Sequence, residues 1–285
     1  MQNTAEEQLN TVIVPVGEAE SVVIAGRGAD DLCDSANDAA VGCVSKANAG
    51  APAGAMTNKE AAEKLRGANS GLKPSLSRRG YRFMKRICDI VASGAAIILL
   101  LVPGLILSVI ICVKSPGASP LYSQLRVGRL RKDGAYRLFR MWKFRSMVPH
   151  ADEMLFGLCD RNEADGPLFK IKGDPRIIPG IGTFIRKHSI DELPQLLNVF
   201  VGQMSLVGPR PGLPSEVVQY DHRAKQRLAV KPGCGGAWQA GERSDSTFEE
   251  MVDLDLDYIE KSSLSHDLGL IFGTVRSMFD GKGAY

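Results

Sequence analysis

The stretch from Ile90 to Val113 contains no charged residue. About twenty apolar residues are enough for a helix to cross the hydrocarbon core of a bilayer, so this stretch is long enough to be a membrane segment. Pro103 stands in its interior. A proline inside a helix removes one backbone hydrogen bond and favours a kink or a break. The sequence therefore predicts a membrane helix that is broken near its middle.

Both flanks of this stretch are basic. Residues 78–86 hold five cationic side chains, and the far side carries Lys114, Arg126, Arg129, Arg131 and Lys132. Because Lys and Arg accumulate on the cytoplasmic side of a membrane, a straight span would place one basic flank on the wrong side. We therefore expect a re-entrant helix that enters and leaves on the cytoplasmic face. A single kinked span is the alternative.

One carboxylate, Asp89, lies at the start of the apolar stretch. A charge in such a position is costly unless it is paired. Lys85 and Arg86 precede it by four and three residues, on the same side of a helix. We expect Asp89 to pair with these two cations.

Composition separates residues 1–77 from the rest of the chain. They hold ten acidic and six basic side chains, a net charge of −4, so residues 78–285 carry +7 of a chain total of +3. The first part has few aromatic residues, and we expect residues 1–77 to be a largely disordered tail. The basic remainder suits anionic lipid or phosphate. It carries no nucleic-acid-binding motif, so no nucleic-acid partner is expected.

Residues 117–285 have the mixed pattern of a soluble domain. Two short strands are predicted, around residues 120–124 and 136–145, and helices near residue 151 and over residues 215–228 and 247–262. A last amphipathic helix begins at Leu264 and belongs either in the core or at a membrane interface. The predicted fold class is α+β: a re-entrant helix within residues 78–116, then a small, mainly helical cytoplasmic domain with short strands.

Asp191 and Glu192 open a short apolar segment that ends at Asn198. Pro194 suits a first helical turn, where its missing N–H would have no partner. The pair is thus expected beside a helix N-terminus, where the helix dipole favours ionised carboxylates and attracts phosphate. Such an Asp is a candidate nucleophile, and its neighbour is a candidate ligand for a hard cation. A bare Asp-Glu pair, however, more often simply caps a surface helix.

The ordered set of motifs resembles the bacterial sugar transferases, the monotopic phosphoglycosyl transferases that make polyprenyl-diphosphate-linked sugars. The resemblance runs from about Tyr81 to the end of the chain. Its two longest motifs are residues 189–198 and 202–211. The others are residues 85–89, residues 143–147, Asp174-Pro-Arg176-Ile, Arg186, Pro232-Gly233, Trp238-Gln239 and Arg243.

The resemblance implies a catalytic domain that transfers a sugar-1-phosphate from a UDP-sugar to polyprenyl (undecaprenyl) phosphate and releases UMP. This would be the first membrane step of exopolysaccharide, capsule or glycoconjugate synthesis, on the cytoplasmic face of the inner membrane. Asp191 would form an aspartyl-phosphosugar intermediate, and Glu192 would hold Mg²⁺. The implied phosphate-binding residues are Lys143, Arg145, Arg186, Arg210 and Arg243. Inner-membrane lipid is a further expected partner, and a homodimer is left open.

Two departures from the family pattern follow Pro232-Gly233. Gly235 replaces the usual threonine, and Glu242 stands where a glycine is common. If this loop contacts the nucleotide or the sugar, the preference for the donor could be unusual. Two alternatives are open for Asp174 and Arg176, a role at the donor phosphates or an internal salt bridge, and we leave Asp174 out of the metal site.

Two other functions compete with this interpretation. Asp253-Leu-Asp255 has the Asp-x-Asp spacing that metal-dependent glycosyltransferases use, although on an amphipathic helix this spacing would scatter the carboxylates into solvent. Such an enzyme would release UDP instead of UMP. The second competing function is a non-catalytic membrane scaffold for polysaccharide assembly. A scaffold, however, has no use for paired carboxylates beside phosphate-binding arginines.

Overall fold

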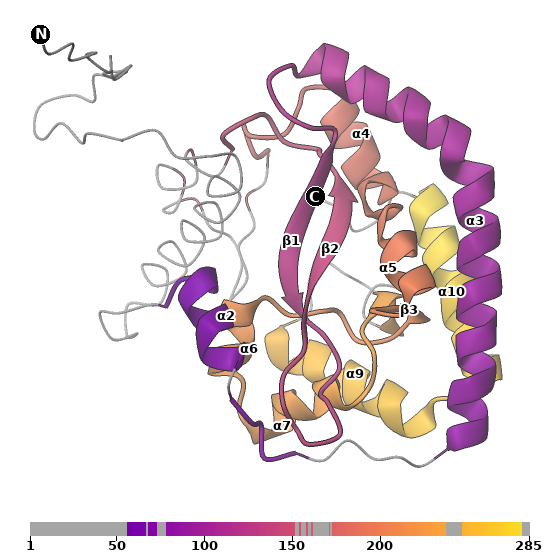
Figure 1. Cartoon of the computed structure of the whole chain (residues 1–285). Helices are drawn as coiled ribbons and strands as arrows, with labels where there is room; N and C mark the ends of the chain where they lie inside the picture. The colour runs from indigo at the N-terminus through magenta and orange to yellow at the C-terminus, as the bar shows by residue number, and fades with distance from the viewer. Residues whose placement is uncertain are drawn as a thin grey trace, which may run out of the picture.

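The computed structural model of the chain describes residues 56–66, 68–72, 78–151, 154, 158, 161, 171, 173–237 and 247–280. Its architecture is mixed helix and sheet, with one helix far longer than the others (Figure 1). In this part of the chain the helices are α2 (Asn58–Arg66), α3 (Arg79–Lys114), α4 (Ile181–Lys187), α5 (Gln195–Val201), α6 (Pro214–Gln219), α7 (His222–Lys225), α9 (Phe248–Lys261) and α10 (Leu264–Asp280). The 3₁₀ turns are η2 (Ile190–Glu192) and η3 (Gln226–Ala229), and the strands are β1 (Leu121–Val127), β2 (Leu138–Phe144), β3 (Ser205–Val207) and β4 (Gly233–Gly235).

Helix α3 is 36 residues long and continues through Pro103, so the predicted break is a bend within one helix. In Figure 1 the helix follows one side of the domain and then slopes across its top. Its apolar side chains are largely exposed, as at Ile98 (78%) and Leu99 (76%). A core helix of a soluble protein would be mostly buried, so α3 has the length, composition and exposure of a membrane segment.

The N-terminal part of α3 is fixed to the rest of the domain by polar contacts. The Arg86 guanidinium donates to the carbonyls of Val199 (2.6 Å) and Phe200 (2.7 Å) at the end of α5. Asp89 is buried and accepts hydrogen bonds from the Ser205 hydroxyl and the Leu206 N–H, both at 3.0 Å. The expected pairing of Asp89 with Lys85 and Arg86 is therefore wrong. Asp89 instead ties α3 to strand β3.

Lys85 takes part in a second contact, with the C-terminal helices. Its ammonium lies 2.8 Å from a carboxylate oxygen of Asp267, which is buried at the start of α10. Tyr81 and Tyr258 donate to the same carboxylate, each at 2.7 Å. Asp267 thus has three donors from α3 and α9, which hold α10 beside α3.

The C-terminal part of α3 contacts the same domain again. Ile111 is fully buried in a cluster with Ile178 and Ile185, and Leu107 and Phe144 pack against this cluster. Since both ends of α3 contact one domain, the helix lies along that domain and does not project away from it.

The predicted pair of strands is confirmed as an antiparallel hairpin. Strands β1 and β2 are in register from Leu121 opposite Phe144 to Val127 opposite Leu138. Asn198, in α5, accepts from the Trp142 N–H (3.1 Å) and donates to the Arg140 carbonyl (2.7 Å). This one amide fixes α5 against β2.

The other helix predictions have mixed outcomes. The helix over residues 247–262 is confirmed as α9, whose first turn is capped by the Thr247 hydroxyl. The single helix predicted over residues 215–228 is instead three short elements, α6, α7 and η3. The chain turns at Tyr220, and Asp221 then caps α7 by accepting from the Ala224 N–H at 2.7 Å. The helix predicted near residue 151 falls mainly outside the described residues.

Part of the predicted disordered tail is folded. Residues 58–66 form helix α2, which lies against α6 (Figure 1). The apolar side chains of Ala61, Ala62 and Leu65 are buried there, and this burial supplies the free energy that orders the helix. Residues 1–55 lie outside the described residues.

Helix α10 carries an exposed apolar stripe. Leu268 (56% exposed), Phe272 (73%) and Val275 (45%) are spaced four and three residues apart, on one side of the helix. Two positions were considered for this helix, in the core or at a membrane interface. This exposed side of α10 lies outside the core.

Candidate active site

The two carboxylates of the predicted pair lie in a tight turn between two helices. Helix α4 ends at Lys187, and Ser189 adopts a left-handed conformation (φ 53°) that redirects the chain. Asp191 and Glu192 follow in η2, and Pro194 is the N-cap of α5. The predicted position beside a helix N-terminus is confirmed.

Lys143 reaches this turn from strand β2. Its ammonium lies 2.8 Å from Oε1 of Glu192, and both side chains keep access to solvent, with 24% and 34% exposed. The Asn198 amide holds the contact in place, because it joins the neighbouring strand residues to α5. Sequence reasoning missed Asn198, although an Asn in an otherwise apolar helical segment was a signal for a positioning role.

The carboxyl group of Asp191 has a pKa above its ordinary value. Burial is the main reason that its pKa rises from 3.8 to about 6, and the negative charge of Glu192 adds to the rise. The positive charges of Lys143 and Arg186 act in the opposite direction. Arg186 stands in the last turn of α4 and also lowers the pKa of Asp174. The structure thus brings Lys143 and Arg186 together around the two carboxylates.

Strand β4 adds a thiol that the sequence did not single out. Cys234 is close enough to Glu192 and Lys143 for their charges to affect it. Burial raises the pKa of the Cys234 thiol, and the charge of Glu192 raises it further. The thiol is therefore neutral near pH 7, and it is not a candidate nucleophile because the thiolate is the reactive form.

Arg145, although only two residues after Lys143, is not part of this arrangement. It is 8% exposed, and its guanidinium donates to the carbonyls of Ser115 (2.5 Å), Ala118 (3.0 Å) and Ser119 (2.8 Å) and to the Ser115 hydroxyl (3.0 Å). These bonds fix the loop that leaves α3. The structure therefore gives Arg145 an anchoring role in place of the phosphate-binding role that we expected.

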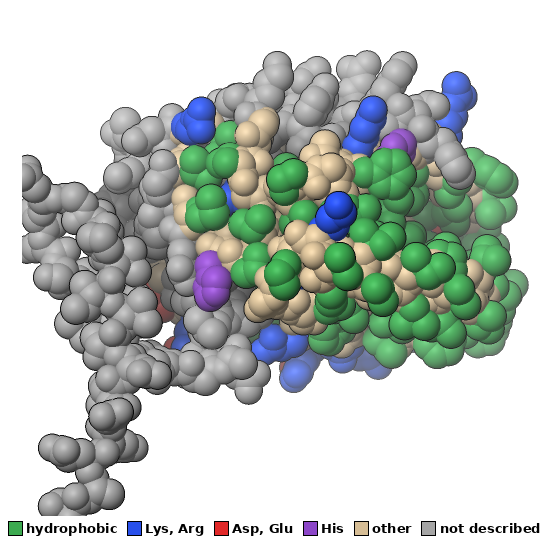
Figure 2. Space-filling view, turned by 90° about the horizontal axis from the view of Figure 1, so that it is seen from above, with side chains coloured by type: hydrophobic (Ala, Val, Ile, Leu, Met, Phe, Trp, Pro, Cys, Tyr) green, Lys and Arg blue, Asp and Glu red, His purple; other side chains and the backbone are tan. Residues whose placement is uncertain are grey.

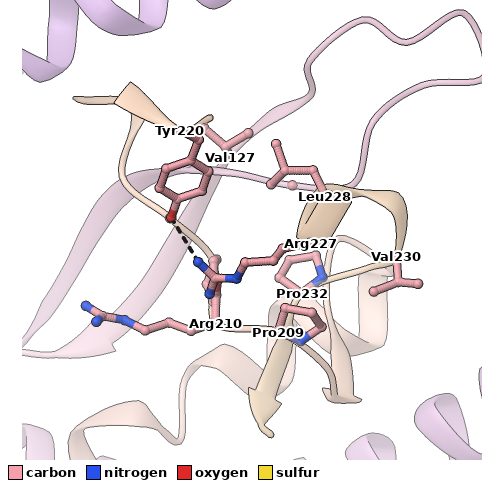
Figure 3. A pocket seen from close by; sticks show the side chains of 11 residues that line it. Val127, Pro209, Arg210, Tyr220, Arg227, Leu228, Val230 and Pro232 are labelled. Carbon is pink, nitrogen blue, oxygen red and sulfur yellow. Dashed lines mark hydrogen bonds between the residues drawn. The ribbon is translucent and has the colours of Figure 1, made fainter. Parts of the chain in front are cut away.

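Arg210 lies in the Pro-Arg-Pro turn and lines a small cavity of about 10 Å³, room for one water molecule (Figure 3). The Arg210 side chain extends away from Tyr220 and Arg227, which share a hydrogen bond of 3.2 Å across the cavity. Arg126 is its buried neighbour. Burial first, and then the charge of Arg210, lowers the pKa of Arg126 to about 10.

Arg243, with Trp238 and Gln239, lies outside the described residues. So does Glu242, one of the two departures from the family pattern. The expectation of a phosphate-binding Arg243 stays a prediction.

The competing Asp-x-Asp site has no converging carboxylates in the structure. Asp255 is buried and pairs with Arg227 (2.6 Å), while Asp253 pairs with Arg223 and Asp257 with Lys261. Each carboxylate has its own cation, and Asp255 lies on the opposite side of α9 from Asp253 and Asp257. The expectation that these acids are solvated is wrong for Asp255, which is 1% exposed.

Of the two alternatives for Asp174 and Arg176, the structure shows the internal salt bridge, with 2.6 Å between Nη2 and Oδ2. Across the described residues, no three His, Cys, Asp or Glu side chains gather as a metal-binding group.

Comparison with known proteins identifies the family of this chain. The family model described as bacterial sugar transferase matches residues 80–281. The chain belongs to the bacterial sugar transferase family. Among curated relatives, this sugar transferase is 42% identical over 216 residues to the UDP-galactose-lipid carrier transferase of Erwinia amylovora, a match that covers 74% of this chain and 43% of that protein.

Two further relatives show the range of lengths. The exopolysaccharide production protein ExoY of Rhizobium meliloti is 36% identical over 206 residues, covering 70% of this chain and 88% of that protein. The UDP-glucose:undecaprenyl-phosphate glucose-1-phosphate transferase of Escherichia coli is 34% identical over 213 residues, covering 72% and 42%. The match of this sugar transferase thus spans less than half of some relatives and most of another.

Proposed function

We propose that this protein transfers a sugar-1-phosphate from a UDP-sugar to undecaprenyl phosphate and releases UMP. Three relatives are named for a transfer of this kind: a UDP-galactose-lipid carrier transferase, an undecaprenyl-phosphate galactose phosphotransferase and a UDP-glucose:undecaprenyl-phosphate glucose-1-phosphate transferase. The observation that carries the proposal is the turn at Asp191 and Glu192, where a carboxylate with a raised pKa lies among positive charges beside an apolar surface.

The proposed reaction has two displacements at one phosphorus atom. A carboxylate oxygen of Asp191 first attacks the phosphorus that bears the sugar, and the bond from that phosphorus to the oxygen of UMP breaks. UMP leaves with the electron pair. A phosphate oxygen of undecaprenyl phosphate then attacks the same phosphorus, which breaks the acyl-phosphate bond and restores the Asp191 carboxylate. One nucleophile used in this way predicts ping-pong kinetics.

Charge neutralisation is the main contribution of the surrounding residues, since phosphoryl transfer depends chiefly on positioning and electrostatics. Lys143 contacts Glu192 directly. The positive charge of Arg186 acts on Asp191 and favours its ionised form. We assign the donor phosphates to Lys143, Arg186 and Arg210, and propose Arg243 as a further ligand. Arg145 is left out because its hydrogen bonds hold the loop after α3.

The carboxylates of η2 fit Mg²⁺ as a cofactor. Mg²⁺ typically takes one or two carboxylate oxygens and completes its shell with water and substrate phosphates. Glu192 would hold the ion, with Asp191 beside it. When bound, the ion would neutralise the diphosphate, which the two carboxylates would otherwise repel.

We place α3 in the cytoplasmic leaflet of the inner membrane as a re-entrant helix. Contacts of the domain with both ends of α3 support this placement, because a straight span would carry one end to the far side. Hydrophobic side chains also gather on the face shown in Figure 2, with a few Lys and Arg side chains among and around them. A homodimer stays a prediction.

Exposed apolar residues next to the carboxylates support a lipid acceptor. Phe184 (53% exposed) precedes them on α4, and Leu197 (46%) and Val201 (65%) follow on α5. Side chains of this kind suit an interfacial position, as does the stripe on α10. In that position Asp191 and Glu192 would lie at the level of the lipid headgroups, where the phosphate of undecaprenyl phosphate is found.

Nucleotide release from a panel of UDP-sugars, with undecaprenyl phosphate and Mg²⁺ present, tests the proposed function. The wild-type protein should release UMP with one donor or a few, and Asp191→Asn should lose at least 1000-fold in rate. A covalent adduct of sugar-phosphate mass should form on the wild type when the acceptor is withheld.

Asp253→Asn is the matched control, since Asp253 is an exposed carboxylate of the competing Asp-x-Asp site. It should keep wild-type activity. Release of UDP, or loss of activity in Asp253→Asn with retention in Asp191→Asn, would establish glycosyl transfer instead. A folded protein that releases no nucleotide would favour the scaffold.

A further inference from the structure

The segment formed by residues 57–72 lies before the part of the chain that matches the family model, which begins at residue 80. It nevertheless begins with a well-formed helix cap. The Thr57 N–H donates to the Glu60 carboxylate (2.9 Å), and the Glu60 N–H donates to the Thr57 hydroxyl (3.1 Å). Both exchanged bonds satisfy N–H groups that the first turn would leave without a partner. We call residues 57–72 the strap.

The strap is part of the main hydrophobic core. Leu65 is 4% exposed and belongs to the same cluster as Val127, Val217 and Tyr220. Ala68 and Leu72 pack against this cluster from the second half of the strap. The strap therefore completes the core that supports Tyr220, which is also a wall of the cavity beside Arg210.

The first half of the strap is hydrogen-bonded to the start of α6. Asn58 is 2% exposed, and its side-chain oxygen accepts from both the N–H (3.1 Å) and the hydroxyl (2.7 Å) of Ser215. The N–H groups in the first turn of a helix have no partner within the helix. Asn58 thus caps α6 from a segment more than 150 residues away in sequence.

Ser215 lies five residues after Arg210, and strand β1 holds the loop between them from the opposite side. The Val127 N–H donates to the Gly212 carbonyl at 3.0 Å, and Arg126 donates to the Pro211 carbonyl at 3.0 Å. A side chain at Gly212 would meet the Tyr220 hydroxyl at 2.7 Å, so the loop is packed tightly. Asn58 and β1 are therefore two of the clamps on the Arg210 loop, residues 209–215. The Gly233 N–H, which donates to the Pro209 carbonyl (3.0 Å), and Arg227, which donates to the Arg210 carbonyl (3.4 Å), also hold this loop.

The second half of the strap is fixed to the turn of the β1–β2 hairpin. The Asn69 amide donates to the Asp133 carbonyl (2.6 Å), and the Ser70 N–H donates to the Gly134 carbonyl (3.1 Å). Gly134 has a positive φ of 86°, and a side chain there would meet the Asn69 amide oxygen at 2.6 Å. The strap therefore has a second, independent anchor.

We propose that the strap positions Arg210, and that Asn58 and Ser215 are positioning residues for the donor phosphates. The proposal rests on the proposed function, in which Arg210 binds those phosphates. With the Asn58 cap removed, the Arg210 loop loses one clamp and Arg210 samples more orientations. Binding of the donor then weakens, while the chemistry at Asp191 is little affected.

The experiment compares Asn58→Ala and Ser215→Ala with Glu63→Ala, whose side chain is exposed on the same helix. All three are made in the full-length protein. Hydrogen exchange by mass spectrometry should show residues 209–217 exchanging at least tenfold faster in Asn58→Ala. Ser215→Ala, which keeps the backbone donor, should show a smaller increase, and Glu63→Ala should show none.

Steady-state kinetics gives the second measurement. In Asn58→Ala the KM for the UDP-sugar should rise at least fivefold, with kcat within twofold of the wild type. Unchanged exchange at residues 209–217, or faster exchange with an unchanged KM, would overturn the proposal. A wild-type protein without sugar-phosphate transfer would overturn the proposed function, and the exchange comparison would still decide whether the strap holds the loop.

Discussion

Asp191 and Glu192 are neighbours in sequence, yet their surroundings differ. Glu192 has a direct partner in Lys143 at 2.8 Å. Asp191 has a pKa of about 6, chiefly because it is buried, and the charge of Glu192 adds to the shift. Two carboxylates whose environments differ in this way are suited to different tasks. Glu192, which pairs with Lys143, suits the binding of a cation. Asp191, which has the raised pKa, suits covalent chemistry.

The raised pKa of Asp191 predicts that the rate of the reaction depends on pH. Asp191 must be ionised to attack phosphorus, and a raised pKa means that its protonated form persists up to about pH 6. We expect kcat/KM for the donor to fall as the pH drops through about 6, or slightly lower because bound Mg²⁺ favours the carboxylate. An acid limb near pH 4 would contradict the raised pKa.

Lys143→Met tests the positive charge that opposes this rise in the pKa of Asp191. The positive charge of Lys143 lowers the pKa of Asp191, so its removal should move the acid limb upward, toward neutral pH. Arg140→Met, which removes an exposed cation from the same strand, is the control and should leave the limb in place. Equal pH profiles for wild type and Lys143→Met would show that Lys143 is too well screened to matter.

At the scale of elements, α9 is held by a buried ion pair. Arg227 and Asp255 are 2% and 1% exposed at their side chains and lie 2.6 Å apart. Arg227 also donates to the Tyr220 hydroxyl, which joins this pair to the wall of the cavity beside Arg210. Removing one member of a buried pair leaves an uncompensated charge in the core.

We therefore expect Asp255→Ala to lower the free energy of unfolding by about 3–5 kcal/mol. Asp253→Ala removes an exposed partner from the same helix and should cost at most about 1 kcal/mol. Thermal unfolding in detergent, compared with that of the wild type, measures both. A small effect of Asp255→Ala accompanied by loss of bound metal would instead revive the Asp-x-Asp site.

At the scale of the whole molecule, α3 is the candidate membrane anchor of the domain. Its N-terminal part is tied to α5 by Arg86 and to β3 by Asp89, and its C-terminal part is buried against Ile178 and Ile185. A helix with both ends on one domain, and with its middle apolar and exposed, fits a shallow re-entrant path better than a span.

Labelling with a membrane-impermeant maleimide tests this path. Arg79→Cys and Lys114→Cys, each in a protein whose natural cysteines are replaced, mark the two ends of α3. Both should react from the cytoplasmic side in inverted membrane vesicles, and neither in intact spheroplasts. Reaction of the two positions from opposite sides would establish a span.

Local features of this protein could be predicted from its sequence alone. Apolar length and basic flanks identified α3, and the two strands of the β1–β2 hairpin and helix α9 were also predicted. The pair Asp191 and Glu192 was also placed correctly at a turn before a helix. Each of these depends on residues that are near one another in the chain, where spacing and propensity act directly.

The hydrogen-bond and ion-pair partners of the charged side chains depend on the tertiary structure, because many of them lie far away in sequence. Arg145 was expected at phosphate but bonds to the loop after α3, and Asp89 bonds to β3 instead of the cations one turn away. Asp255, which was expected to be solvated, is buried. Residues 58–66, which were expected to belong to a largely disordered tail, form a helix whose Ala61, Ala62 and Leu65 are buried in the core. A buried polar group must find a partner wherever the fold brings one, and that partner is set by packing between segments far apart in sequence.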